Sequence, residues 1–80
     1  MSQDRPNLTP EACRAARALL AISTQDLAAR IGVSPTTINK FETGGDLRAS
    51  TAIKIVDGFD GLGVQILNGD APGARLKPRT

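Results

Sequence analysis

The sequence contains no histidine, tryptophan or tyrosine, and it has one cysteine among its 80 residues. A single cysteine cannot form an intrachain disulfide, and without histidine a Cys/His zinc site is excluded. Histidine-dependent catalysis is excluded for the same reason. Paired carboxylates, a phosphate-binding loop and an activated nucleophile are also missing. We therefore expect no enzyme, no metal, no cofactor and no small-molecule ligand.

Long hydrophobic runs are missing as well. The uncharged stretch around residues 18–25 is too short to span a membrane. Residues 1–6 contain neither an apolar run nor a signal-peptide pattern. Together with the free thiol, these features predict a cytoplasmic protein with no membrane partner. The formal net charge of +2 permits an anionic partner without demonstrating one.

The length of the chain allows one small domain, whose own core supplies only a few kcal/mol. Small domains are usually stabilised further by disulfides, a metal or a second subunit. Because the first two are excluded, we expect a homodimer.

Helical patterns occupy most of the chain. Residues 1–7 are polar and predict a flexible arm. Thr9 as a cap and Pro10 at the first helical position predict a helix over 10–21. A later helix is predicted over 49–59, and it leaves Ile53 off its core stripe, either exposed or at a dimer contact.

The C-terminal part has a different pattern. Partly alternating apolar and polar residues on both sides of a turn-rich stretch predict a β-hairpin over 63–77. A flexible tail is predicted at 78–80. An isolated hairpin is marginally stable in water, so it must pack on the helices or pair with another chain. The helical domain preceding it spans 8–62.

The most informative segment is 23–44. Ser23 and Ser34 are predicted to cap two short helices. Gly32, which lies between them, is predicted to end the first of these helices. A glycine about nine residues into a roughly twenty-residue unit is typical of a helix-turn-helix. Apolar side chains are expected to lock these two helices together: Leu27, Ala28, Ile31, Val33, Ile38 and Phe41. Phe59 is expected in the core as well, and Cys13 as a small buried group.

This packing leaves a polar face on the second short helix. It comprises Pro35, Thr36, Thr37, Asn39, Lys40 and Thr43. No acidic residue occurs from position 31 to position 41, which suits a polyanionic partner. Asn can bond adenine, Lys can reach guanine acceptors, and Thr offers a methyl group to thymine.

These segments resemble the lambda-repressor-like (Cro/C1, XRE) helix-turn-helix family. The resemblance rests on LTPE at 8–11, RAARALL at 14–20, STQDLAARIGVS at 23–34, TINKFETG at 37–44 and TAIKI at 51–55. It implies a mainly α fold, a compact bundle of four or five helices. The tail GVQILNGDAPGARL at 63–76 is similar to a C-terminal β-hairpin extension of small bacterial members.

The resemblance also implies a function and its residues. Most members bind palindromic operator DNA as homodimers and repress transcription, with the third helix in the major groove. Matched positions give base-reading roles to Pro35, Thr36, Thr37, Asn39 and Lys40. They give phosphate contacts to Thr24, Gln25, Ser34, Thr43, Gly44, Gly45, Arg48, Arg17 and Lys54. Glu42 matches a structural acid, and we expect the hairpin to form the dimer interface through Val64, Ile66, Leu67 and Leu76.

A second interpretation stays open. Asp46 departs from the usually basic loop after the third helix and would repel phosphate if it faced DNA. With the modest net charge, this keeps a protein-interaction module on the same fold as an alternative, either an antitoxin or an antiactivator that sequesters a protein partner. The primary expectation is a DNA-binding regulator from a bacterium or a mobile element.

Overall fold

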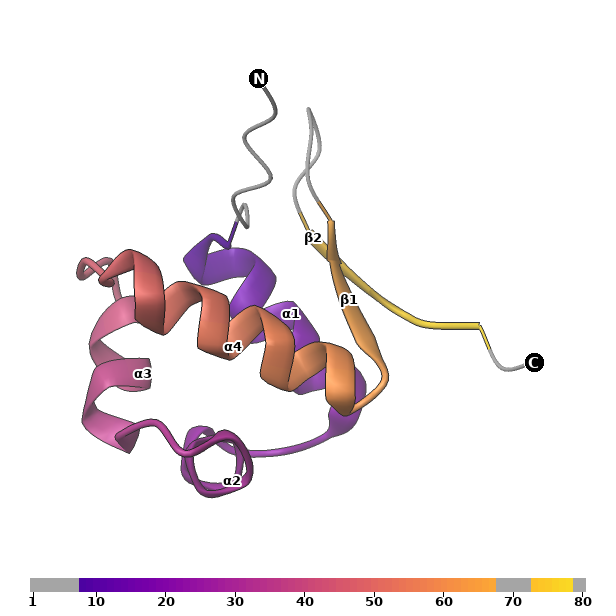
Figure 1. The fold of residues 1–80 in the computed structure, drawn as a ribbon, viewed down its shortest axis with the longest axis horizontal. Coiled ribbons are helices and arrows are strands. Elements are labelled where there is room, and N and C mark those ends of the chain that lie inside the picture. The colour runs from indigo at the N-terminus through magenta and orange to yellow at the C-terminus, as the bar shows by residue number, and fades with distance from the viewer. Residues whose placement is uncertain (1–7, 68–72, 79–80) are drawn as a thin grey trace.

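The computed structural model describes residues 8–67 and 73–78. The expected arm at 1–7, the hairpin turn at 68–72 and the end of the expected tail at 79–80 lie outside the described residues. The chain forms four helices followed by two strands (Figure 1), which are α1 (Pro10–Leu20), α2 (Thr24–Ile31), α3 (Pro35–Glu42), α4 (Ala49–Gly61), β1 (Val64–Leu67) and β2 (Gly73–Leu76). The predicted mainly α bundle with a C-terminal hairpin is confirmed, and α4 extends two residues beyond its predicted end.

The helices begin at the predicted caps. The side chains of Thr9 and Ser23 each accept a hydrogen bond at 3.0 Å from the backbone N–H three residues later. The Ser34 hydroxyl accepts the N–H of Thr36 at 3.2 Å. Gly32 ends α2 in the left-handed conformation, with φ at +73°. Ala21 ends α1 in the same conformation, one residue earlier than predicted.

The core lies between the four helices and the hairpin. Both phenylalanines, Phe41 and Phe59, are buried as expected, and so is Cys13. Side chains from every helix and from β1 complete the buried set: Ala12, Ala16, Leu27, Ala28, Ile38, Ile55, Val64 and Ile66. Ile53 is 47% exposed on α4, which confirms that it lies off the core stripe.

The hairpin packs against its own chain. In the antiparallel pair, Val64 lies opposite Leu76 and Ile66 lies opposite Ala74. Val64 is fully buried and Ile66 nearly so, because this face of the sheet covers α1 and α4. The side chains of Val64 and Ile66 are therefore not available to a partner chain, contrary to expectation. Of the four expected dimer residues, Leu67 is half-buried and Leu76 is exposed.

A close approach joins α4 to the helix-turn-helix. A Cβ added to Gly58 would lie 2.3 Å from Cγ2 of Ile31 and 2.8 Å from its Cβ. Ile31 is the last residue of α2 and directly precedes the turn. The missing side chain at position 58 therefore lets α4 support the end of α2.

We predict that Gly58→Ala destabilises the protein. Although alanine is the better helix former, overpacking against Ile31 is expected to lower the free energy of unfolding by roughly 1–3 kcal/mol. Urea denaturation measures this change. The matched control is Gly61→Ala in the same helix, where nothing lies within 4 Å of an added Cβ, and it should be neutral or slightly stabilising. Equal stability of the two variants would show that this contact is not tight.

Candidate nucleic-acid interface

The turn between α2 and α3 is fixed by backbone hydrogen bonds. Gly32 and Val33 both donate their N–H groups to the carbonyl of Ala28, at 2.9 and 3.2 Å. The buried side chains of Leu27 and Ile38 lie on the facing sides of the two helices. The opposite side of α3 is left at the surface. Figure 1 shows α3 at one side of the molecule and the hairpin at the other.

The exposed side of α3 carries the residues that the sequence singled out. Pro35, Thr36, Asn39 and Lys40 are exposed, whereas Thr37 is half-buried. Within the described part of the chain, the side chains of Thr36, Asn39 and Lys40 make no hydrogen bond or salt bridge. This surface, which we call the α3 polar face, therefore presents unused hydrogen-bonding groups and one positive charge.

The loop after α3 is tied to the end of that helix. The Thr43 hydroxyl donates to the carbonyls of Asn39 and Lys40, at 3.0 and 3.1 Å. The Gly45 N–H donates to the Lys40 carbonyl at 2.7 Å. A Cβ at Gly45 would lie 2.8 Å from that same oxygen, and Gly44 has φ at +107°. The backbone conformation of this loop therefore requires both glycines. Thr43, Gly44 and Gly45 are exposed.

The other expected phosphate contacts surround the helix-turn-helix. Gln25, at the start of α2, is exposed, and Thr24 beside it is half-buried. Arg48, directly before α4, is exposed and makes no side-chain cap. Lys54 extends from α4 to the turn, since its Nζ would lie 3.8 Å from a Cβ on Gly32. The structure thus brings Lys54 beside the turn, and the capping Ser34 is also exposed there.

The one acid of α3 is turned inward. The Glu42 side chain is only 6% exposed. It accepts two hydrogen bonds from the Arg17 guanidinium, from Nε at 2.8 Å and from Nη2 at 2.7 Å. The Cys13 thiol donates to Oε2 at 3.1 Å, and the Arg14 guanidinium donates to the backbone carbonyl of Glu42. Three α1 residues therefore hold the C-terminal end of α3, and the interpretation of Glu42 as a structural acid fits this geometry.

Arg17 has a different partner from the one expected. Its side chain is 21% exposed, and besides Glu42 it donates to the carbonyl of Ile22 at 3.1 Å. Because its charge is balanced inside the protein, we remove Arg17 from the expected phosphate contacts. Sequence reasoning also gave no role to Arg14, whose guanidinium donates to the last residue of α3. The available signal was the three-residue spacing of two arginines, which places both on one side of α1.

The Glu42 and Cys13 side chains titrate far from neutral pH. Burial raises the pKa of Glu42, but hydrogen bonds from Arg17 and Cys13 and the charges of Arg17 and Arg14 outweigh it, so this pKa lies below its usual value. Burial, together with the hydrogen bond to the Glu42 carboxylate, raises the pKa of the Cys13 thiol far above its usual value. The thiol therefore stays protonated and acts as a donor.

We predict that Glu42→Gln destabilises the protein in a pH-dependent way. Because the folded-state pKa lies below the unfolded value of about 4.3, the carboxylate stabilises the fold above that pH. This contribution is lost as pH falls through the folded-state pKa. At pH 7 the substitution should cost roughly 2–4 kcal/mol, since it leaves Arg17 without its counter-charge. Urea denaturation at a series of pH values measures the difference, which should shrink at acidic pH.

The control for this experiment is Glu11→Gln. The Glu11 carboxylate is 77% exposed and lies 3.9 Å from Arg14, a surface pair expected to contribute below about 0.5 kcal/mol. If Glu42→Gln lowers the free energy of unfolding no more than Glu11→Gln does, or by an amount that does not change with pH, the buried ion pair does not stabilise the fold as proposed.

Two short helices around a fixed glycine turn, with an acid-free polar face on the second, define a helix-turn-helix DNA-binding protein. A family model described as helix-turn-helix (HTH_3) matches residues 14–69, well over half of the chain. The chain belongs to this family, the lambda-repressor-like or XRE helix-turn-helix proteins. No match was found among curated proteins.

The family consists of DNA-binding regulators that are typically not enzymes. Within residues 8–67 and 73–78, no helix has the length and apolar character needed to cross a bilayer. The same residues hold no cluster of three or more potential metal-ligating side chains.

Proposed function

We propose that the protein is a transcriptional repressor that binds a palindromic operator as a homodimer, with α3 of each chain in a major groove. The observation that carries this proposal is the α3 polar face, which is exposed and free of acidic residues. Glu42 holds α3 against α1 from the opposite side of the helix. An operator-bound dimer would act by excluding polymerase, and two half-sites would lie about one helical turn apart, or roughly 34 Å.

The base-reading residues in this proposal are Pro35, Thr36, Thr37, Asn39 and Lys40. Asn39 offers an amide for adenine, Lys40 an ammonium group for guanine acceptors, and Thr36 a methyl group for thymine. All three are exposed. Thr37, which is half-buried, offers less surface to a base than its neighbours do.

The phosphate contacts in this proposal flank α3. Ser34, Thr24 and Gln25 lie at helix N-termini, where backbone N–H groups favour anions. In the loop after α3 the N–H groups of Thr43, Gly44 and Gly45 all donate to the helix itself. These N–H groups are therefore not free to bind phosphate. In this proposal the exposed loop lies close to the DNA backbone, and the positive charge comes from Arg48 and Lys54.

We predict that Lys40→Ala and Asn39→Ala each weaken binding to a duplex selected from a random pool. Loss of a base contact costs about 1–3 kcal/mol, which corresponds to roughly fivefold to 150-fold in Kd. Fluorescence anisotropy at several salt concentrations measures Kd. For the wild-type protein the affinity should fall steeply as salt rises, because counterions are released from the DNA.

The matched control is Lys77→Ala, which removes the same charge. Lys77 lies on the hairpin side and pairs with Asp60 at 2.9 Å, so less than about a twofold change in Kd is expected. Duplex binding that survives both α3 substitutions, or that does not respond to salt, would contradict the proposal. A protein-interaction module on the same fold, such as an antitoxin or antiactivator, would then be the better account.

A further inference from the structure

Two arginines of α1 reach the end of α3, and they are bound differently. Arg17 places two N–H groups on the Glu42 carboxylate, whose Oε2 also accepts the Cys13 thiol. Arg14 donates through Nη1 to the backbone carbonyl of Glu42. Within the residues that the structure describes, this is the single hydrogen bond of the Arg14 side chain, which is 47% exposed. Most of its N–H groups therefore lack a protein acceptor.

The charges of this cluster do not cancel. Two guanidinium groups meet one buried carboxylate, because the Cys13 thiol is neutral. Arg14 also lies near Glu11, but this carboxylate is 3.9 Å from Nη2 and 77% exposed. A surface pair of this length contributes little. The charge of Arg14 is therefore available to a partner outside the chain.

The guanidinium of Arg14 lies beside the loop after α3. The carbonyl that it binds belongs to the last residue of α3, and Thr43 follows directly. Residues 43–45 are exposed, but their N–H groups all donate to α3 itself. Asp46 then adds a negative charge to this loop. In the proposed function the loop lies close to the DNA backbone, so the positive charge beside it has to come from another element.

We propose that Arg14 binds a DNA phosphate at the C-terminal end of α3. This inference rests on the proposed function. A guanidinium has five N–H donors in a planar fork, so Arg14 can keep the Glu42 carbonyl on one of them and offer others to phosphate oxygens. Gln25 and Ser34 lie toward the N-terminal end of α3. Phosphate contacts at both ends would fix the position of α3 in the groove.

A phosphate suits this position better than a base edge. Arg14 belongs to α1, outside the α3 polar face, and its guanidinium is held by a backbone carbonyl. Base edges lie inside the groove, where the proposed function places Asn39 and Lys40. Phosphate contacts carry no sequence information directly, and they release counterions. The contribution of Arg14 should therefore be similar on any duplex and should weaken as salt rises.

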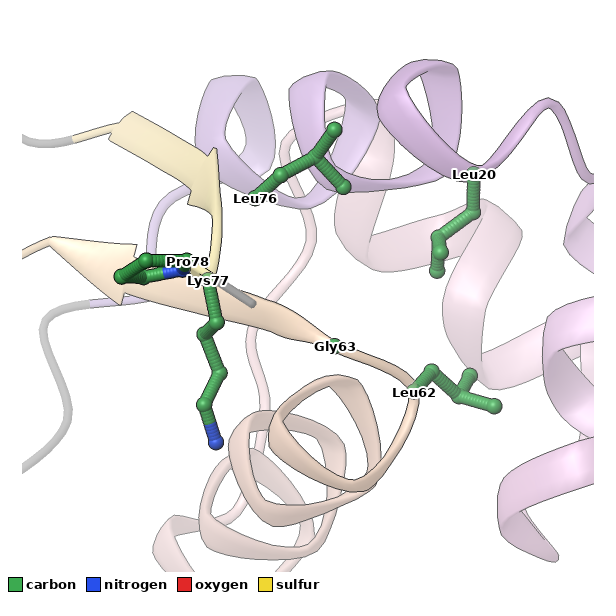
Figure 2. A pocket seen from close by; sticks show the side chains of 6 residues that line it. All are labelled: Leu20, Leu62, Gly63, Leu76, Lys77 and Pro78. Carbon is green, nitrogen blue, oxygen red and sulfur yellow. The ribbon is translucent and has the colours of Figure 1, made fainter. Parts of the chain in front are cut away.

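The hairpin side of the molecule supplies a matched control. It carries an apolar groove (Figure 2), which is lined by Leu20, Leu62, Gly63, Leu76, Lys77 and Pro78. The cation of this groove, Lys77, pairs with Asp60. Arg75 on β2 is exposed and, like Arg14, donates to a neutral acceptor, the Gln65 side chain at 2.9 Å. The hairpin and α3 lie on opposite sides of the molecule (Figure 1), so Arg75 is an arginine away from the proposed interface.

Fluorescence anisotropy of Arg14→Gln tests the proposal between about 0.05 and about 0.5 M salt, with the selected duplex and a scrambled one. Glutamine removes the charge and keeps an amide donor for the Glu42 carbonyl. Loss of one phosphate contact should lower the slope of log Kd against log salt by about 0.9 on both duplexes. The excess of the variant Kd over the wild-type Kd should therefore shrink about eightfold across this range. Arg14→Lys should restore most of the slope, and Arg75→Gln should leave it unchanged.

A wild-type salt slope in Arg14→Gln would overturn the proposal even if the affinity falls, because Arg14 would then act only by holding α3. A slope that Arg14→Lys does not restore would overturn it as well. If circular dichroism shows that Arg14→Gln does not fold, the wild-type protein decides. The NMR signal of the Arg14 Nε–H should shift when the selected duplex is added, and that of Arg75 should not. No shift at Arg14 would contradict the proposal.

The failure of this inference differs from the failure of the proposed function. Duplex binding that depends on Lys40 but keeps its salt slope in Arg14→Gln would overturn the phosphate contact and keep the DNA-binding function. A wild-type protein that binds no duplex would overturn the proposed function, and this inference with it.

Discussion

The ion pair between Glu42 and Arg17 is the interaction on which the rest of the structure depends. It joins the last residue of α3 to the last turn of α1, across 25 positions of sequence, through two short hydrogen bonds. Breaking such a pair leaves a charge with no partner in a poorly solvated place. The thiol of Cys13 and the guanidinium of Arg14 satisfy the remaining acceptors around it. The orientation of α3 is thus determined from its inner side.

The burial of Glu42 on the inner side of α3 explains how a chain of net charge +2 can present a surface suited to DNA. The acid of α3 is turned inward and neutralised, so the outward side has Lys40 as its only charge. The Gly44–Gly45 path uses its N–H groups to hold the end of α3, and Gly58 allows α4 to support the end of α2. Distribution of charge and rigid support, rather than net charge, are what the fold contributes to binding a polyanion.

Local patterns in the sequence predicted most of the fold. Caps such as Thr9 and Ser23, the stop at Gly32 and the alternation around the hairpin turn depend on neighbours within a few residues, and the structure confirms each. The errors concern contacts between distant segments. Nothing near Arg17 in the sequence indicates Glu42 as its partner, and alternation alone does not say whether Val64 faces its own helices or a second chain. The close approach at Gly58 likewise depends on where α4 crosses α2.

We propose that α3, held by Glu42, is the surface that meets DNA. The most direct measurement is an NMR titration of the ¹⁵N-labelled protein with a duplex selected for binding, following every backbone amide. We expect the largest shift changes from Thr36 to Lys40 and in the loop after α3, with small changes in the outward-facing residues of β1. Changes concentrated on the hairpin, with α3 unaffected, would contradict it.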